Sequence, residues 1–277
     1  MIKFAHSIFA LPFALIGFFM ALHINEIQFD YMKLIYIVLA MVFARNAAMG
    51  FNRYIDRNID KDNPRTNNRE LPAGIIKPHA ALIFVIINSL LFWGVTWFIN
   101  NLTFALAPVA LLVVLGYSLT KRITALCHLI LGLGLSLSPI GAYLSVTGAF
   151  DHWAPISLSF AVLFWTAGFD IIYALQDVEF DQEKNLYSIP QTFGRPKSLF
   201  ISRILHIVSG FLILLTGYIM EANYIYFIGS AVFIAFLINQ HRIIKIDDLS
   251  KVNLAFFTMN GLASLVFGIF SILSFYL

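Results

Sequence analysis

Long apolar segments alternate with short polar ones along the whole chain. A membrane-spanning helix needs about 20 mostly apolar residues, and nine segments come close to that length. They cover residues 4–22, 33–52, 79–99, 102–119, 124–145, 153–176, 199–219, 223–240 and 253–275. The pattern predicts an all-α, polytopic membrane protein with nine transmembrane helices, built as a single membrane domain over residues 1–277.

The first apolar segment has the position of a signal peptide, because Lys3 precedes it at the start of the chain. The segment is long enough to span a bilayer, and no small-x-small cleavage pattern follows it. We therefore expect a retained first helix.

Composition agrees with the membrane assignment. The chain has 277 residues, of which 60% are hydrophobic and 12% charged. Soluble domains carry about 25% charged residues, so the soluble class is excluded. The single cysteine, Cys127, excludes an internal disulfide. The net charge of +3 bears first on membrane topology, and we expect no nucleic-acid partner.

Lysine and arginine concentrate on one side of the predicted membrane. With nine helices, 16 of the 18 basic residues fall at the N-terminus or in the loops after helices two, four, six and eight. Lys33 falls on the other side, and Arg45 lies within the second helix. The positive-inside rule places the basic side in the cytoplasm. We expect a bacterial inner-membrane protein with its N-terminus inside, its C-terminus outside, and two long polar loops (53–78 and 177–198) in the cytoplasm.

Acidic residues mark the helix ends that precede both long loops. Asn52, Asp56 and Asp60 are spaced four residues apart, so a helix would place them on one stripe about 6 Å apart. Asp177 and Asp181 repeat this spacing after the sixth helix. Amide and carboxylate oxygens suit Mg²⁺, which often bridges a carboxylate and a substrate phosphate.

A single acidic pair has a simpler explanation than a metal site. Charges are common at solvated helix ends, and Arg53 and Arg57 could balance Asp56 and Asp60. Two such groups on the same side of the membrane favour a site that holds Mg²⁺ against a diphosphate.

Asp170 and Tyr173 share the stripe of the second acidic group. Asp170 falls about two turns inside the apolar segment, and an intramembrane carboxylate is a functional candidate by default. The alternative is a buried hydrogen bond to a Tyr or Ser of a neighbouring helix. His6, His23, His128 and His206 show no metal-ligand spacing, so we treat them as ordinary polar groups.

Basic residues occur beside and within the predicted helices. Tyr117-x-x-x-Lys121-Arg122 closes the fourth helix. Its two cations either anchor the topology or bind a diphosphate or an aromatic carboxylate, for which arginine offers a bidentate fork. Arg45 lies about two turns before Asn52 and needs an anionic partner. That partner is either a protein acid such as Asp170 or the acidic head of a substrate.

These motifs, in this order, resemble the signatures of the UbiA superfamily of intramembrane aromatic prenyltransferases. The first signature corresponds to residues 52–60 together with the loop RTNNRELPAG at 65–74. The others correspond to Tyr117-x-x-x-Lys121 and Asp177-x-x-x-Asp181. One departure is Arg53, where members often have Asp, and it leaves the number of Mg²⁺ ions open. The resemblance implies nine helices around a central cavity, open sideways to lipid and capped by the cytoplasmic loops.

The resemblance also implies Mg²⁺-dependent transfer of a prenyl group from a polyprenyl diphosphate to an aromatic ring. Asp56, Asp60, Asp177 and Asp181 would be catalytic and, with Asn52, would hold the Mg²⁺–diphosphate. Substrate-binding roles would fall to Arg45, Tyr117, Lys121, Arg122, Asp170 and Tyr173. The stretch 169–177 is similar to 4-hydroxybenzoate polyprenyltransferases of ubiquinone or menaquinone synthesis, with 4-hydroxybenzoate or a dihydroxynaphthoate as acceptor. The expected partners are these substrates and membrane lipid, without an obligate protein partner.

A transporter or lipid flippase with an acidic ion-coupling site is the rival interpretation. Against it, the acids stand mostly at one membrane face, away from the midplane. A CDP-alcohol phosphotransferase also uses acids and Mg²⁺, but its D-G-x-x-A-R signature is absent from the sequence.

Overall fold

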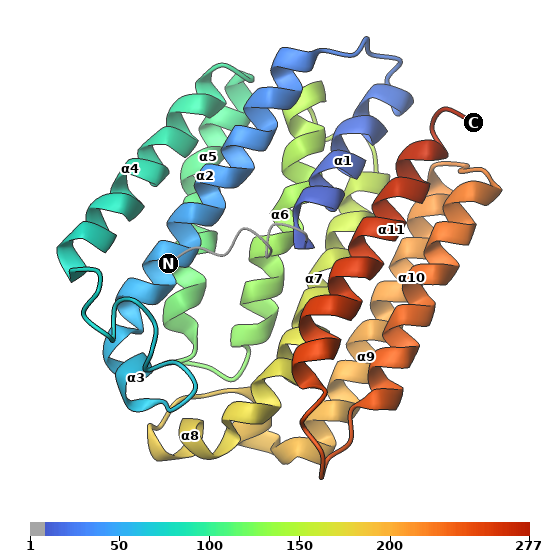
Figure 1. The fold of residues 1–277 in the computed structure, drawn as a ribbon. Coiled ribbons are helices and arrows are strands. Elements are labelled where there is room, and N and C mark those ends of the chain that lie inside the picture. Colours follow the sequence, from blue (N-terminus) through green and yellow to red (C-terminus); the bar gives the residue numbers. More distant parts are fainter. Residues whose placement is uncertain (1–8) are drawn as a thin grey trace.

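The computed structural model describes residues 9–277 as a bundle of helices joined by loops (Figure 1). A 3₁₀ turn at Leu175–Asp177 precedes α8, and a π-helical turn at Leu254–Met259 precedes α11. The α-helices are α1 (Leu11–Ile24), α2 (Tyr31–Ile55), α3 (Arg57–Asp62), α4 (Pro78–Trp97), α5 (Asn101–Thr120), α6 (Cys127–Thr147), α7 (Ala154–Ala174), α8 (Val178–Glu183), α9 (Ile189–Ile219), α10 (Tyr224–Ile243) and α11 (Asn260–Leu273).

The predicted membrane helices are confirmed, with one difference at the start. Within residues 9–277, eight helical segments are long and apolar enough to cross a membrane. The first predicted helix corresponds to α1, which has 14 residues and is shorter than these eight. Its predicted beginning at residues 4–8, and Lys3 before it, lie outside the described residues. The chain is therefore a multi-pass membrane protein.

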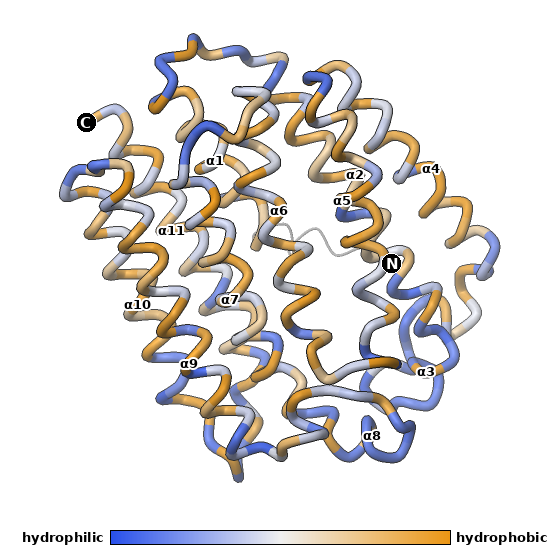
Figure 2. Tube along the Cα trace, turned by 180° about the vertical axis from the view of Figure 1, so that it is seen from behind, coloured by the Kyte–Doolittle hydropathy of each residue, from blue (hydrophilic) through white to orange (hydrophobic). Residues whose placement is uncertain are grey.

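The helices pack side by side around the centre of the bundle. Helices α4 and α5 lie beside α2 at one side, and α9, α10 and α11 lie at the other (Figure 1). Helix α7 packs between α6 and α9, and α1 packs against α6 and α11. The two short helices α3 and α8 share one end of the bundle, where hydrophilic segments gather (Figure 2). Both long polar loops therefore meet at the same end.

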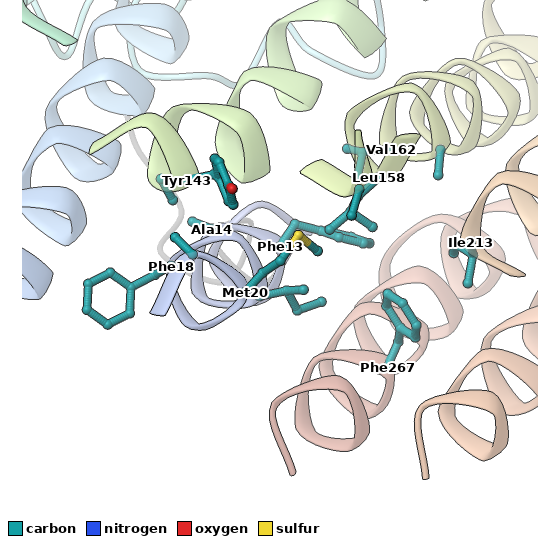
Figure 3. Close-up of a cluster of buried hydrophobic side chains, with 14 of the residues drawn as sticks. Phe13, Ala14, Phe18, Met20, Tyr143, Leu158, Val162, Ile213 and Phe267 are labelled. Carbon is teal, nitrogen blue, oxygen red and sulfur yellow. The ribbon is translucent and has the colours of Figure 1, made fainter. Parts of the chain in front are cut away.

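An aromatic core joins the helices of the second half to α1. Phe13 of α1, Leu158 of α7 and Phe267 of α11 are fully buried in it (Figure 3). Trp165 is also fully buried and donates its indole N–H to Asn260. Many large apolar side chains, such as Leu112 and Phe211, instead face outward, as a lipid-facing surface requires.

Both acidic motifs lie where a long helix gives way to a short one. Asp56 separates α2 from α3, and Asp177 ends the 3₁₀ turn between α7 and α8. Helical spacing survives the first junction, because the amide of Asp56 donates to Asn52 O (3.0 Å) and the amide of Asp60 donates to Asp56 O (2.7 Å). The chain can thus turn its carboxylates toward the bundle axis while the loops begin.

Candidate active site

Two cavities adjoin inside the bundle, and the smaller lies at its charged end. The larger has a volume of about 610 Å³ and is lined mostly by apolar side chains of α2, α5 and α6. The smaller, about 260 Å³, is lined by polar and charged side chains. Asn52, Tyr117 and Leu131 line both cavities. A charged pocket therefore opens onto an apolar chamber at these three residues.

Acids from both halves of the chain line the charged pocket. Asp56, Asp60 and Asp177 all contribute to its wall, together with Asn52. The Asn52 amide group donates to Asp56 Oδ2 at 3.0 Å, which leaves its oxygen available as an acceptor. The predicted convergence of the two acidic groups on one pocket is what the structure shows for these residues.

Each of these carboxylates is met by an arginine. Arg122 lies 2.7 Å from Asp56 Oδ1, and Arg69 Nη1 donates to both oxygens of Asp60 at 2.7 Å. Arg65 reaches Asp177 through Nε (3.2 Å) and Nη2 (2.6 Å). It also donates to the Tyr173 hydroxyl at 2.6 Å, with its guanidinium 5.0 Å from the centre of the tyrosine ring.

The two arginines considered from the sequence have smaller roles. Arg53 comes only within 3.9 Å of Asp60, and Arg57 donates to the backbone oxygen of Tyr54. The main counter-ions, Arg65 and Arg69, come from the loop after α3, and no role was predicted for either. The available signal was their place in the stretch 65–74, which resembles a family signature, but their partners depend on how that loop folds back.

Asp181 occupies a different position from the other acids. Its side chain is fully buried behind the pocket, where Oδ1 lies 2.7 Å from Lys121 Nζ and Oδ2 accepts from Ser188 at 3.0 Å. The backbone oxygen of Lys121 also accepts from the amide of Tyr187. Lys121 itself lines the pocket, so Asp181 reaches the site through the ammonium that it holds.

The protonation states follow from burial and from these contacts. Burial raises the pKa of the Asp56 carboxyl, and the neighbouring Arg122 opposes that effect without cancelling it. Burial also works to lower the pKa of the Lys121 ammonium, but Asp181 outweighs it, so that pKa is raised overall. Lys121 is therefore a fixed cation, whereas Asp56 gains from any additional positive charge nearby.

Asp170 lines the charged pocket and pairs with His128. His128 Nδ1 lies 2.7 Å from Asp170 Oδ2, and His128 Nε2 accepts from the amide of Ile189 at 3.3 Å. The expected alternative partner, a Tyr or Ser, is wrong, because the hydrogen-bond partner of Asp170 is His128. The two residues are 42 positions apart, and their contact arises because α6 packs along α7.

Arg45 lies on the wall of the larger cavity, on the same side of α2 as Asn52. This is the position that the seven-residue spacing predicted. Tyr117 lies at the junction of the two cavities. All the predicted site residues except Asp181 thus line one of the two cavities.

The donor set of the pocket suits a hard divalent cation. Asn52, Asp56, Asp60 and Asp177 line its wall, and the amide and carboxylate oxygens that they carry are typical ligands of Mg²⁺. Within residues 9–277 no three acidic, His or Cys side chains are already gathered as a metal cluster. The reason is that each carboxylate is turned to a basic side chain, so a metal would have to arrive with an anion that engages those bases.

Comparisons with known proteins find similar sequences over most of the chain. A model of the UbiA prenyltransferase family matches residues 10–262. A 4-hydroxybenzoate octaprenyltransferase of Aeromonas salmonicida is 30% identical over 238 residues, covering 86% of this chain and 82% of that protein. One of Psychromonas ingrahamii is 31% identical over 224 residues, covering 80% and 77%.

Solved structures show the same arrangement of helices. The apo structure of a UbiA homologue from Aeropyrum pernix K1 matches with a TM-score of 0.88 and 28% identity, covering 99% of each chain. A UbiA homologue from Archaeoglobus fulgidus, bound to GPP and Mg²⁺, matches with a TM-score of 0.68 and 19% identity, covering 99% of this chain and 100% of that one.

Proposed function

Because the chain belongs to the UbiA prenyltransferase family, we propose that it transfers a polyprenyl group from a polyprenyl diphosphate to an aromatic acid. The acceptor is 4-hydroxybenzoate or a dihydroxynaphthoate, and the product serves ubiquinone or menaquinone synthesis. The names of the relatives that are 30% and 31% identical support the aromatic acceptor.

The observation that carries this proposal is the junction of the apolar chamber with the charged pocket at Asn52, Tyr117 and Leu131. A polyprenyl diphosphate has the same division into an apolar tail and an anionic head. Burying the tail in the chamber is favourable for the reason that any apolar surface leaves water. The head then lies among the acids and bases of both long loops.

Asn52, Asp56, Asp60 and Asp177 would hold Mg²⁺, since all four line the pocket and carry oxygen ligands. Asp181, also a predicted ligand, would act from behind through Lys121. When bound, Mg²⁺ supplies positive charge that stabilises a leaving diphosphate. The Archaeoglobus homologue bound to Mg²⁺ supports this choice of metal.

The basic side chains would bind the diphosphate directly. Arg65, Arg69, Lys121 and Arg122 all line the pocket, and each is paired with one carboxylate. Fixed cations aimed at the leaving oxygens lower the barrier to breaking the allylic C–O bond. The carboxylates keep these cations in place, and the diphosphate competes for the same N–H donors.

The apolar chamber would protect the reaction from water. An allylic cation is quenched by water, and a dry wall prevents that side reaction. Arg45, inside the chamber, would bind the carboxylate of the aromatic acid, with Arg122 as the other candidate. Ionisation, attack by the ring and loss of a proton would then follow within one enclosed space.

The charged end of the bundle would face the cytoplasm of a bacterial inner membrane, by the distribution of basic residues. The N-terminus would lie inside and the C-terminus outside. Labelling of a cysteine introduced at Asn68 from the cytoplasmic side only would agree with this orientation.

The test is transfer by the purified protein in detergent. A labelled polyprenyl diphosphate is incubated with a panel of aromatic acids, with and without Mg²⁺, and the products are separated. Product formation without an ion gradient distinguishes an enzyme from a transporter or flippase. Asp56→Ala, Asp60→Ala and Asp177→Ala should each abolish transfer. Asp62→Asn is the matched control, because Asp62 lies in the same loop but pairs with Lys184 outside the pocket.

A further inference from the structure

Helix α7 and the 3₁₀ turn that follows it present a series of polar groups to the two cavities. Asp177 of the turn and Asp170 of α7 line the charged pocket, and Thr166 of α7 lines the apolar chamber. Asp170 precedes Asp177 by seven residues, and Thr166 lies about 6 Å further along α7 at 1.5 Å per residue. Asp170 is thus set back from the acids at the helix end, at the approach to the chamber.

The contacts of His128 fix how Asp170 is held. The amide of Ile189 donates to His128 Nε2, so that nitrogen is the acceptor of the ring. Nδ1 then carries the hydrogen and donates it to Asp170 Oδ2 at 2.7 Å. The imidazole is almost completely buried, whereas the carboxylate is 21% exposed toward the pocket. The pair is therefore an oriented carboxylate with a free face, backed by a buried histidine.

Thr166 points to a polar ligand in the same region. Its hydroxyl is fully buried on the chamber wall and has no hydrogen-bond partner within residues 9–277. A buried hydroxyl without a hydrogen bond destabilises the folded protein, and a prenyl tail has no hydrogen-bonding group to pair with it. Phe169 and Phe256 line the chamber beside it, with ring centres 5.2 Å apart. An aromatic molecule with a polar substituent would satisfy both kinds of surface.

We propose that Asp170 takes the proton of the acceptor's ring hydroxyl, that His128 positions Asp170 for this step, and that Thr166 binds the same acceptor. This assignment rests on the proposed function and identifies the acceptor as a phenol. The Asp170 carboxylate hydrogen-bonds the hydroxyl and receives its proton as the ring carbon ortho to it forms a bond to C1 of the prenyl group. The electron pair of the C1–O bond leaves with the diphosphate.

The product of this attack is a dienone, which must regain aromaticity. It loses the proton from the newly substituted carbon to the departing diphosphate and takes back the proton held by Asp170. One carbon–carbon bond has then formed, one carbon–oxygen bond has broken, and Asp170 is again a carboxylate. A phenol activated in this way is a stronger nucleophile, and positioned bases of this kind contribute about 10²–10⁴-fold in rate.

The experiment compares two acceptors that differ in the need for a base. One is whichever aromatic acid the wild type prenylates, and the other is its ring-fluorinated analogue, assayed at a pH where only the analogue's hydroxyl is ionised. Asp170→Asn should lower kcat about 100-fold with the parent acid. With the ionised analogue it should stay within about threefold of the wild type, because no proton needs to be taken.

Two further variants separate positioning from contact. His128→Gln retains an acceptor for the Ile189 amide and should lower kcat about tenfold with the parent acid only, leaving KM for the prenyl diphosphate unchanged. This variant carries the test if Asp170→Asn does not accumulate in membranes. Thr166→Val should raise KM for the acceptor about fivefold without changing that for the diphosphate. Asp151→Asn, which changes a hydrogen-bonded acid in the loop between α6 and α7 that lines neither cavity, is the control.

The outcomes distinguish this assignment from the function on which it rests. Equal losses with both acceptors in Asp170→Asn and His128→Gln, beside an active wild type, would overturn the role of Asp170 alone. A wild type that prenylates no phenol would overturn the proposed function and the assignment together. Selective rescue by the ionised analogue would establish the proton transfer, since a purely structural defect would affect both acceptors alike.

Discussion

The ion pair between Lys121 and Asp181 should be strongly asymmetric in its contribution to stability. Asp181 is fully buried, whereas the Lys121 side chain is 36% exposed toward the pocket. Removing the cation by Lys121→Met leaves a carboxylate that water cannot reach, and breaking a buried pair in this way costs about 3–5 kcal/mol. Removing the acid by Asp181→Asn leaves an ammonium that water can solvate, so we expect a cost of about 1–2 kcal/mol.

The double variant Lys121→Met/Asp181→Asn completes the cycle. It removes both charges, so its stability should return to within about 1–2 kcal/mol of the wild type. Its prenyl transfer should nevertheless remain lost, because the cation proposed to bind the diphosphate is gone. Stability is measured as the fraction of protein that stays monodisperse when it is heated in detergent. Activity is measured as product formation.

Equal destabilisation by the two single variants would refute this reasoning, because it would mean that the two charges are equally accessible to water. A double variant as unstable as Lys121→Met would show that packing, and not charge, accounts for the loss. Recovery of transfer in the double variant would remove Lys121 from the diphosphate site.

Three further predictions concern the chamber, the helix packing and the metal. Gly141 and Gly134 both line the chamber with room for a side chain. Gly141→Phe should therefore reduce transfer of long prenyl chains more than short ones, whereas Gly134→Phe, about 10 Å nearer the charged pocket, should reduce transfer of both. Equal turnover of all chain lengths by Gly141→Phe would show that the prenyl tail leaves the chamber sideways before it reaches Gly141. Gly132→Ala should destabilise the protein by about 1–3 kcal/mol in thermal unfolding, because its Cβ would overlap the carbonyl oxygen of Leu163, whereas Gly94→Ala, with open space around it, should be neutral or stabilising. Removal of divalent metal with EDTA should abolish transfer while moving the unfolding temperature by less than about 2 °C, since the pocket carboxylates already contact basic side chains; a large drop would indicate a structural metal.

The helices could be predicted from the sequence because lipid leaves few alternatives to a helix for an apolar segment of this length. Helices α4 to α7 begin and end within about three residues of the predicted segments. Helix α9 begins ten residues before its predicted start, since the polar stretch 189–198 is also helical across a kink at Gly194. Hydropathy identifies helices that contact lipid, but it does not identify a polar helix at the membrane surface.

The acids of the site could be predicted as well, because helical spacing is local. The side chains that pair with these acids could not be predicted from the sequence. Arg65 reaches Asp177 across 112 residues, and His128 reaches Asp170 across 42. Such contacts depend on how loops fold over the bundle and on the rotation of α6 against α7. A pattern of residue types within one segment carries no information about either.

The pairing of charges also indicates why the pocket needs both long loops. Arg65 of the first loop binds Asp177 of the second half, and Lys184 of the second loop lies 2.6 Å from Asp62 of the first. The Lys184 pair is largely exposed and contributes little to stability, but the Arg65 pair lines the pocket. An anionic head that draws Arg65 away from Asp177 would free that carboxylate for a metal in the same step. On the proposed function, we therefore expect coupled binding. The diphosphate would supply negative charge to Arg65, the cation would supply positive charge to Asp177, and neither ligand would bind well alone.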